Sequence, residues 1–167
     1  MQKVDYNEYL PEAFESLPDG AFLTVQSDGE KNTMTIGWNL VGVNWSLPMT
    51  LVMVRSSRHT HQLLEDTDGY TISFPLGEQM QEELKYCGSR SGRDHDKFEE
   101  CDLQPLEGRQ VETPVIGGCD LYYECEIVYS QQMDPDKITS QAVRDCYPEG
   151  DYHTLYFGRV LDSYMAE

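Results

Sequence analysis

Apolar and polar residues alternate most regularly over residues 120–129, where Leu121, Tyr123, Cys125, Ile127 and Tyr129 fall on one side of an extended chain. This period of two predicts a long β-strand with one buried face. Shorter runs rich in β-branched and aromatic residues predict five further strands. Their expected bounds are residues 21–26, 32–38, 50–55, 70–74 and 154–161.

Turn and helix signals separate these strands. Asp28–Gly29 predicts a hairpin turn between the first two strands. Helices are expected at residues 6–16, at residues 56–65 behind a hydroxyl N-cap, and at residues 79–86. The last of these should end at Cys87–Gly88, where glycine can adopt the left-handed cap conformation. We expect one domain over residues 1–167 that is mainly β, an antiparallel barrel with short helices, because the regular β-α-β alternation of a doubly wound sheet is missing.

Charge narrows the possible functions. Twelve Lys and Arg against thirty Asp and Glu give a net charge of −18, which disfavours nucleic-acid and membrane-surface roles. The chain shows no signal-peptide pattern, and its longest apolar runs are too short to cross a bilayer, so we expect a cytoplasmic protein. Five cysteines without a C-x-x-C pair predict neither a disulfide framework nor a zinc site.

The scarce cations are clustered. Arg55 and Arg58 lie at a strand–helix junction, and Lys85, Arg90, Arg93 and Lys97 lie in one later stretch, so two short segments hold six of the twelve basic residues. The first segment also carries Ser56, Ser57 and Thr60, whose hydroxyls could accompany a helix N-terminus in binding a phosphate. The alternative is that these arginines pair with the many carboxylates of the chain. The residues alone leave both interpretations open.

Two other segments are candidates for chemistry. Residues 32–38 combine an amide, hydroxyls, a glycine and Trp38, which suits the edge of a flat heterocycle, although an ordinary strand ending at a core tryptophan has the same sequence pattern. His59, His61 and Glu65 have the spacing of a cupin metal motif. That motif also requires an earlier glycine, where Met53 stands, and adjoining strand positions, whereas this segment is predicted to be helical.

Taken in order, several segments resemble the flavin reductase-like, FMN-binding split-barrel family, and its flavoredoxin-like members in particular. They are G-A-F-L-T-V-Q from Gly20, N-T-M-T-I-G-W from Asn32, T-L-V-M-V-R-S-S-R-H-T from Thr50, C-G-S-R-S-G-R-D-H-D-K-F from Cys87, D-L-Y-Y-E-C-E-I-V from Asp120 and Y-F-G-R-V from Tyr156. The resemblance implies a six-stranded Greek-key split barrel that forms a homodimer and binds one FMN per subunit.

The resemblance also assigns residues to FMN. Those expected to contact the isoalloxazine, the phosphate or the pyrimidine edge are Asn32, Thr35, Ile36, Gly37, Trp38, Arg55, Ser56, Ser57, His59, Thr60, Cys87, Gly88, Lys97 and Phe157. Many members of the family carry a histidine after the long strand, but residues 130–148 contain none. No side chain is required as a catalytic acid or base, because the redox chemistry belongs to the flavin.

The function implied is that of a flavoprotein that takes electrons from NAD(P)H or a redox protein. It would act either as an NAD(P)H-dependent flavin reductase or as a flavoredoxin-like electron carrier. A non-catalytic flavin- or haem-binding module is the alternative from another class, since split barrels recur as binders. A cupin-like metal-binding protein is a further alternative.

Overall fold

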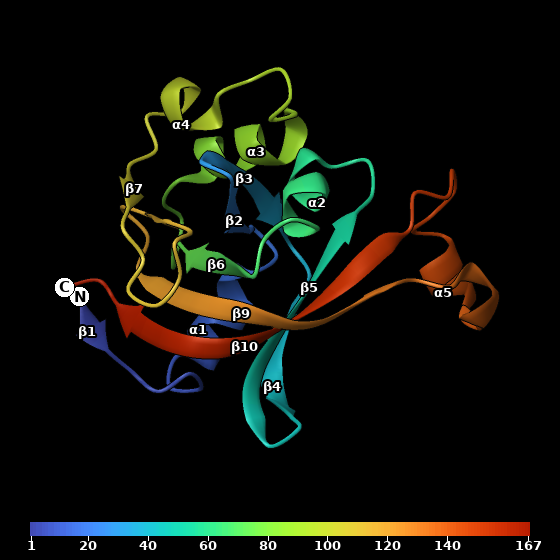
Figure 1. The fold of residues 1–167 in the computed structure, drawn as a ribbon, viewed down its shortest axis with the longest axis horizontal. Coiled ribbons are helices and arrows are strands. Elements are labelled where there is room, and N and C mark those ends of the chain that lie inside the picture. The colour runs from blue at the N-terminus through green and yellow to red at the C-terminus, as the bar shows by residue number, and fades with distance from the viewer.

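The computed structural model describes residues 1–167, and its centre is one antiparallel sheet of eight strands (Figure 1). The strands follow the order β3-β2-β6-β9-β10-β5-β4, and β1 pairs with the end of β10. Their bounds are β1 Gln2–Lys3, β2 Ala21–Ser27, β3 Glu30–Ile36, β4 Asn39–Asn44, β5 Leu47–Arg55, β6 Gly69–Phe74, β9 Leu121–Gln132 and β10 His153–Met165. A separate small ribbon joins β7 (Pro105–Leu106) and β8 (Val115–Ile116). The sheet is curved but not closed, which confirms the predicted mainly-β split barrel.

Two hairpins have the same geometry but different sequence signals. The β2–β3 turn at Asp28–Gly29 has φ values of 49° and 81°, the left-handed pair of a type I′ turn, as predicted. Between β4 and β5, Trp45 and Ser46 have φ values of 52° and 59°. Strand β4 was not predicted, because a Trp-Ser pair lacks the glycine, asparagine or aspartate that usually marks such a turn. The sheet therefore contains β1 and β4 in addition to the six expected strands.

The helices are short: α1 Leu10–Ser16, α2 His59–Leu64, α3 Gln81–Ser89, α4 Lys97–Glu100 and α5 Gln141–Arg144, with a 3₁₀ turn at Pro135–Lys137. In Figure 1, α2, α3 and α4 lie together beside β3 and β2. The predicted end of α3 was wrong, because Cys87 and Gly88 lie inside the helix. A Cβ at position 88 would lie 3.3 Å from the Thr35 Cβ, so glycine lets α3 approach β3 closely.

The predicted hydroxyl N-cap of α2 was also wrong. The residue at that position is Arg58, which makes no side-chain capping hydrogen bond. The preceding serines bond to Asp151 instead.

The core has two parts, one on each side of the sheet. The larger includes Leu23, Ile72, Tyr123 and Tyr156, and the smaller lies under α3 and α4 around Phe22, Leu84 and Tyr122. Strand β9 is consequently buried on both faces over its first five residues, so the single buried face predicted for it was wrong there. No helix in the structure is both long and apolar enough to span a bilayer.

Candidate functional site

Two adjoining hollows lie where the end of β5 and the start of α2 meet β3. The first, which we call the Trp38 hollow, is lined by Met34, Thr35, Ile36, Gly37, Trp38, Met53, Arg55, Arg58 and His153. The second, the Thr60 hollow, is lined by Asn32, Met34, Arg55, Ser57, Arg58, His59, Thr60, Ser89, Arg90, Ser91, Gly92 and Lys97. Because Met34, Arg55 and Arg58 line both, the hollows are two halves of one cleft.

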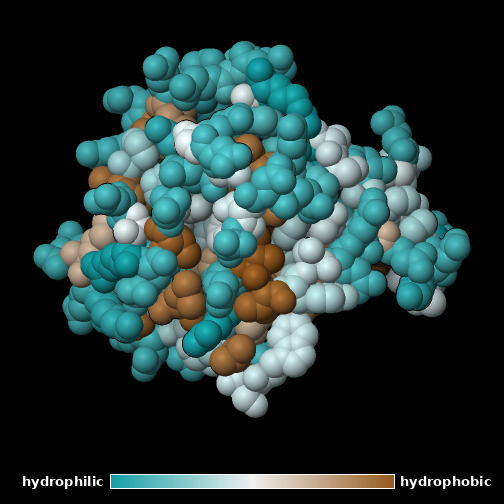
Figure 2. Space-filling model, viewed as in Figure 1, coloured by the Kyte–Doolittle hydropathy of each residue, from teal (hydrophilic) through white to brown (hydrophobic).

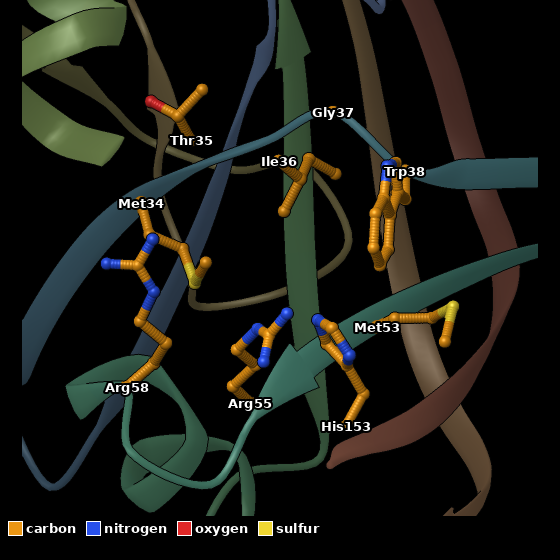
Figure 3. A pocket seen from close by; sticks show the side chains of 9 residues that line it. All are labelled: Met34, Thr35, Ile36, Gly37, Trp38, Met53, Arg55, Arg58 and His153. Carbon is orange, nitrogen blue, oxygen red and sulfur yellow. The ribbon is translucent and has the colours of Figure 1, made fainter. Parts of the chain in front are cut away.

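The Trp38 hollow combines apolar walls with two nitrogen-bearing side chains. In Figure 3, the side chains of Arg55 and His153 both point toward the Gly37–Trp38 turn that follows β3. The His153 ring lies 5.3 Å from the Trp38 ring, centroid to centroid. Methionines, Ile36 and the indole supply apolar surface around these groups. This mixture suits a flat ring with polar atoms along its edge.

His153 is neutral at ordinary pH. Its Nδ1 lies 2.7 Å from the Tyr147 hydroxyl, and the side chain is buried. Burial and, after it, the positive charge of Arg55 lower the pKa of His153 to about 4. An uncharged imidazole with one nitrogen occupied therefore forms part of the wall.

The Thr60 hollow is polar and cationic. Its walls include Arg55, Arg58, Arg90 and Lys97, four of the twelve basic residues of the chain, and none of its thirty acidic residues. Neither does any carboxylate line the Trp38 hollow. In a protein with a net charge of −18, this separation of charge marks the hollow as a place for an anion.

Close packing shapes the floor of the Thr60 hollow. The Asn32 Nδ2 donates to the Thr60 Oγ1 at 2.8 Å, and both residues are buried. A Cβ at Gly92 would lie 2.2 Å from the Asn32 Oδ1, so only glycine allows the loop to lie this close to β3. The His59 Nε2 bonds to Glu30, but its Nδ1 is buried without a partner. An unpaired buried nitrogen beside a cationic hollow fits a bound polar group.

Lys97 is buried at the base of this hollow. Its Nζ donates to the carbonyl oxygens of Thr33 and Cys87, each at 2.9 Å, and thereby ties β3 to α3. Burial lowers the pKa of Lys97 to about 8. Burial also raises the pKa of the Cys87 thiol to about 12, so that thiol stays protonated.

A model of the flavin reductase like domain family matches residues 17–167. The chain belongs to this family. The match covers every strand of the main sheet except β1, together with both hollows.

Several solved structures share the fold of this chain. Flavoredoxin of Desulfovibrio vulgaris (Miyazaki F) superimposes with a TM-score of 0.70 at 21% identity, covering 89% of this chain and 69% of that one. An FMN-binding protein from Thermus thermophilus, with bound p-hydroxybenzaldehyde, gives 0.69 at 24% identity over 89% and 71%. An NADH:FAD oxidoreductase of Streptomyces globisporus gives 0.66 at 20% identity over 88% and 75%.

The resemblance assigns fourteen residues to FMN, and ten of them line the cleft. They are Asn32, Thr35, Ile36, Gly37, Trp38, Arg55, Ser57, His59, Thr60 and Lys97. The hydroxyl of Thr35 is turned away, as Figure 3 shows, and donates to the Leu84 carbonyl. Ser56, Cys87 and Gly88 line neither hollow. The carbonyl oxygens of Cys87 and Gly88 accept hydrogen bonds from the cleft residues Lys97 and Arg58, at 2.9 and 2.8 Å. Phe157 lies elsewhere, against Trp45 and Tyr129.

Several residues that line the cleft are not among those predicted to contact FMN. Those are Met34, Met53, Arg58, Ser89, Arg90, Ser91, Gly92 and His153. The clustering of cations had already indicated Arg58 and Arg90. His153 was not predicted, because the resemblance places the family histidine within residues 130–148, whereas this one stands at the first residue of β10.

The three residues with cupin-like spacing do not converge on a common point. His59 bonds to Glu30, His61 to Thr154, and Glu65 accepts from Tyr156. Nor does the structure contain any group of three or more His, Cys, Asp or Glu side chains able to hold a metal ion.

Proposed function

We propose that this chain binds FMN in the cleft and passes electrons from NAD(P)H to an acceptor, as a flavin reductase or a flavoredoxin-like electron carrier. The observation that carries the proposal is the pairing of an apolar hollow with a cationic one that no carboxylate lines. FMN has the same division, with a flat ring at one end and a phosphate at the other.

The cationic half would hold the phosphate. Arg58, Arg90 and Lys97 supply positive charge there, and a phosphate oxygen accepts charge-assisted hydrogen bonds from such groups. The unpaired His59 Nδ1 and the nearby Thr60 hydroxyl add polar contacts at the floor. Helix α2 has only six residues, so we rest the assignment on these side chains and not on its N-terminus.

The apolar half would hold the ring. Ile36, Trp38 and Met53 exclude water from its faces, and the backbone at Gly37 is open to close approach. A bound flavin supplies the redox chemistry, accepting a hydride from a nicotinamide and releasing electrons onward. The protein's part is to orient the ring and to adjust its electronics through Arg55 and the neutral His153.

Relatives support the finer points. The Thermus protein is described as FMN-binding, which supports FMN, and the Streptomyces protein as an NADH:FAD oxidoreductase, which supports a nicotinamide donor. A cleft that no acidic side chain lines suits FMN and FAD alike, so the experiment below compares the two flavins.

The decisive experiment is reconstitution. We expect the purified protein to bind FMN with a dissociation constant in the micromolar range or below and to become yellow, and the bound flavin to bleach anaerobically with NADH or NADPH. Parallel titrations with FAD identify the preferred flavin. Failure to retain either flavin would refute the proposal, whereas retention without bleaching by either nicotinamide would leave a flavin binder that is not a reductase.

We further propose that two copies of the chain form a homodimer through the β4–β5 hairpin. Leu40, Val43 and Trp45 are 64%, 62% and 61% exposed, and the Trp45 ring packs edge-on against Tyr129 and Phe157. Figure 2 shows apolar residues in brown beside and on this hairpin, at the bottom of the view. Exposed apolar side chains of this size favour burial against another protein surface.

A further inference from the structure

The carboxylate of Asp151 binds the serines that the sequence predicts as phosphate ligands. Its Oδ1 accepts from the Ser56 Oγ and the Ser57 backbone N–H, each at 3.1 Å, and its Oδ2 accepts from the Ser57 Oγ at 2.7 Å. Both oxygens are thus engaged with the turn that joins β5 to α2. Burial pushes the pKa of Asp151 upward, but the bonds from Ser57 and Ser56 and the charge of Arg55 outweigh it, and the net shift is downward. The side chain is therefore ionised in this contact.

Asp151 acts from outside the cleft. It lines neither the Trp38 hollow nor the Thr60 hollow, and Ser56 lines neither as well. The carboxylate itself therefore lies outside both hollows, although its partner Ser57 lines the Thr60 hollow. The backbone of Asp151 has a φ of 51°, in the left-handed region, which aspartate adopts more readily than most non-glycine residues.

The same segment wraps around Arg55. The Arg55 guanidinium donates to the carbonyl oxygens of Cys146 and Asp151, at 2.9 and 3.2 Å, and lies 4.9 Å over the Tyr147 ring. Two residues after Asp151 comes His153, which Tyr147 holds by its Nδ1. Residues 146–153 thus contact two walls of the Trp38 hollow. They are attached at their end by the pairing of His153 with Arg55 between β10 and β5, and through the Asp151 carboxylate to the Ser56–Ser57 turn.

We propose that Asp151 is a positioning residue for the flavin site. By holding residues 146–153 against the Ser56–Ser57 turn, it places Arg55 and His153 beside the flavin ring. This proposal rests on the proposed function, because the ring that Arg55 and His153 would face is that of the proposed FMN. It also applies to the flavin-free protein, where the hydrogen bonds of Asp151 to Ser56 and Ser57 keep the His153 imidazole buried.

The test compares Asp151→Ala, Asp151→Asn and Ser56→Ala with Glu149→Gln. The control removes an exposed carboxylate two residues away, with the same change of charge as Asp151→Asn. The His153 pKa is read by NMR titration of the flavin-free protein. The groups that face this imidazole are Tyr147, Arg55, Arg58 and Asp151.

The direction of the shift separates two explanations. If Asp151 acted only as a nearby negative charge, its removal would lower the His153 pKa below its value of about 4. If Asp151 holds residues 146–153 in place, its removal exposes the His153 imidazole, and the pKa of His153 rises toward the ordinary value of about 6.5. We expect a rise for Asp151→Ala and a smaller rise for Asp151→Asn and Ser56→Ala, with no change for Glu149→Gln.

FMN binding supplies the second measurement. We expect Asp151→Ala to weaken FMN by about ten-fold or more, because a site loosened by a fraction of an ångström loses much of its affinity, and Glu149→Gln to bind like the wild type. A His153 pKa that falls or stays constant in Asp151→Ala, or unchanged FMN affinity, overturns the proposal. If the wild-type protein binds no FMN, the proposed function fails, while the titration still decides whether Asp151 positions His153.

Discussion

The ammonium group of Lys97 donates a hydrogen bond to the carbonyl oxygen of Thr33, 64 positions earlier in the chain, at 2.9 Å. A second bond to the Cys87 carbonyl makes Lys97 the link between the edge strand β3 and helix α3. Because Lys97 also lines the Thr60 hollow, the lysine is a structural member of the cleft as well as a source of charge.

Replacing Lys97 with methionine should therefore destabilise the protein in a pH-dependent way. Loss of the ammonium leaves two carbonyl oxygens without this donor, at a cost of about 1–3 kcal/mol. The folded pKa of Lys97, about 8, lies below the ordinary lysine value of 10.5, so the unfolded chain binds more protons between these values. Stability from this group accordingly rises with pH across that window.

Urea unfolding at pH 7.5 and pH 9.5 checks this sign. The difference in unfolding free energy between wild type and Lys97→Met should be larger at the higher pH. An equal difference at both values, or a smaller one at pH 9.5, would show that the ammonium is not held in the buried position described here.

Arg58→Met should weaken the binding of FMN much more than that of riboflavin. Riboflavin has the ring but no phosphate, so it serves as a matched ligand. A charge-assisted hydrogen bond contributes about 1.5–3 kcal/mol, which corresponds to about 10- to 100-fold in affinity. Fluorescence quenching titrations with both ligands measure the two losses, and Lys137→Met, a remote exposed cation, controls for net charge. Equal losses for the two ligands would contradict the phosphate assignment of the Thr60 hollow.

Gly92→Ala should displace the loop that closes the Thr60 hollow. The added methyl group would lie 2.2 Å from the Asn32 Oδ1, and relief of such overpacking costs about 1–3 kcal/mol. We expect FMN affinity to fall by about 5- to 100-fold. Gly42→Ala is the control, because a Cβ there has no atom within 4 Å. Equal FMN affinities for the two variants would place the cofactor away from this loop.

Trp45→Glu should convert a dimer into a monomer. The charge would lie at the tip of the exposed hairpin, in the middle of the proposed contact. Light scattering coupled to size-exclusion chromatography at micromolar concentration measures the mass. Val143→Glu, on exposed helix α5, is the control, because it adds the same charge at another exposed apolar residue. A wild-type protein that already elutes as a monomer would disprove the dimer.

The sequence predicted the six long strands because their apolar alternation is strong and their turns carry the usual residues. It did not predict β4, since Trp45 and Ser46 adopt left-handed φ values without the residues that normally favour them. It also placed the end of α3 too early, because Gly88 serves the close contact with Thr35 and not a helix cap. Both departures arise from tertiary contacts that local propensity does not contain.

The same distinction applies to the cleft. Local chemistry identified the Arg55–Thr60 segment and residues 32–38, and the structure brings most of them together. It could not show that Ser56 faces Asp151, nor that His153 enters the cleft from β10. Asp151 lies 95 positions from Ser56, and His153 lies 115 positions from Trp38.

Four cations line one hollow of a strongly acidic molecule. The electrostatic potential along the path to this hollow therefore changes sign with distance. Far from the protein, a nucleotide experiences the repulsion of the net charge of −18, whereas at the mouth of the Thr60 hollow it experiences attraction. The screening length falls from about 30 Å at 10 mM salt to about 8 Å at physiological ionic strength. Added salt therefore removes the distant barrier before it weakens the local attraction, and anionic nucleotides should encounter the cleft faster in physiological salt than in dilute buffer.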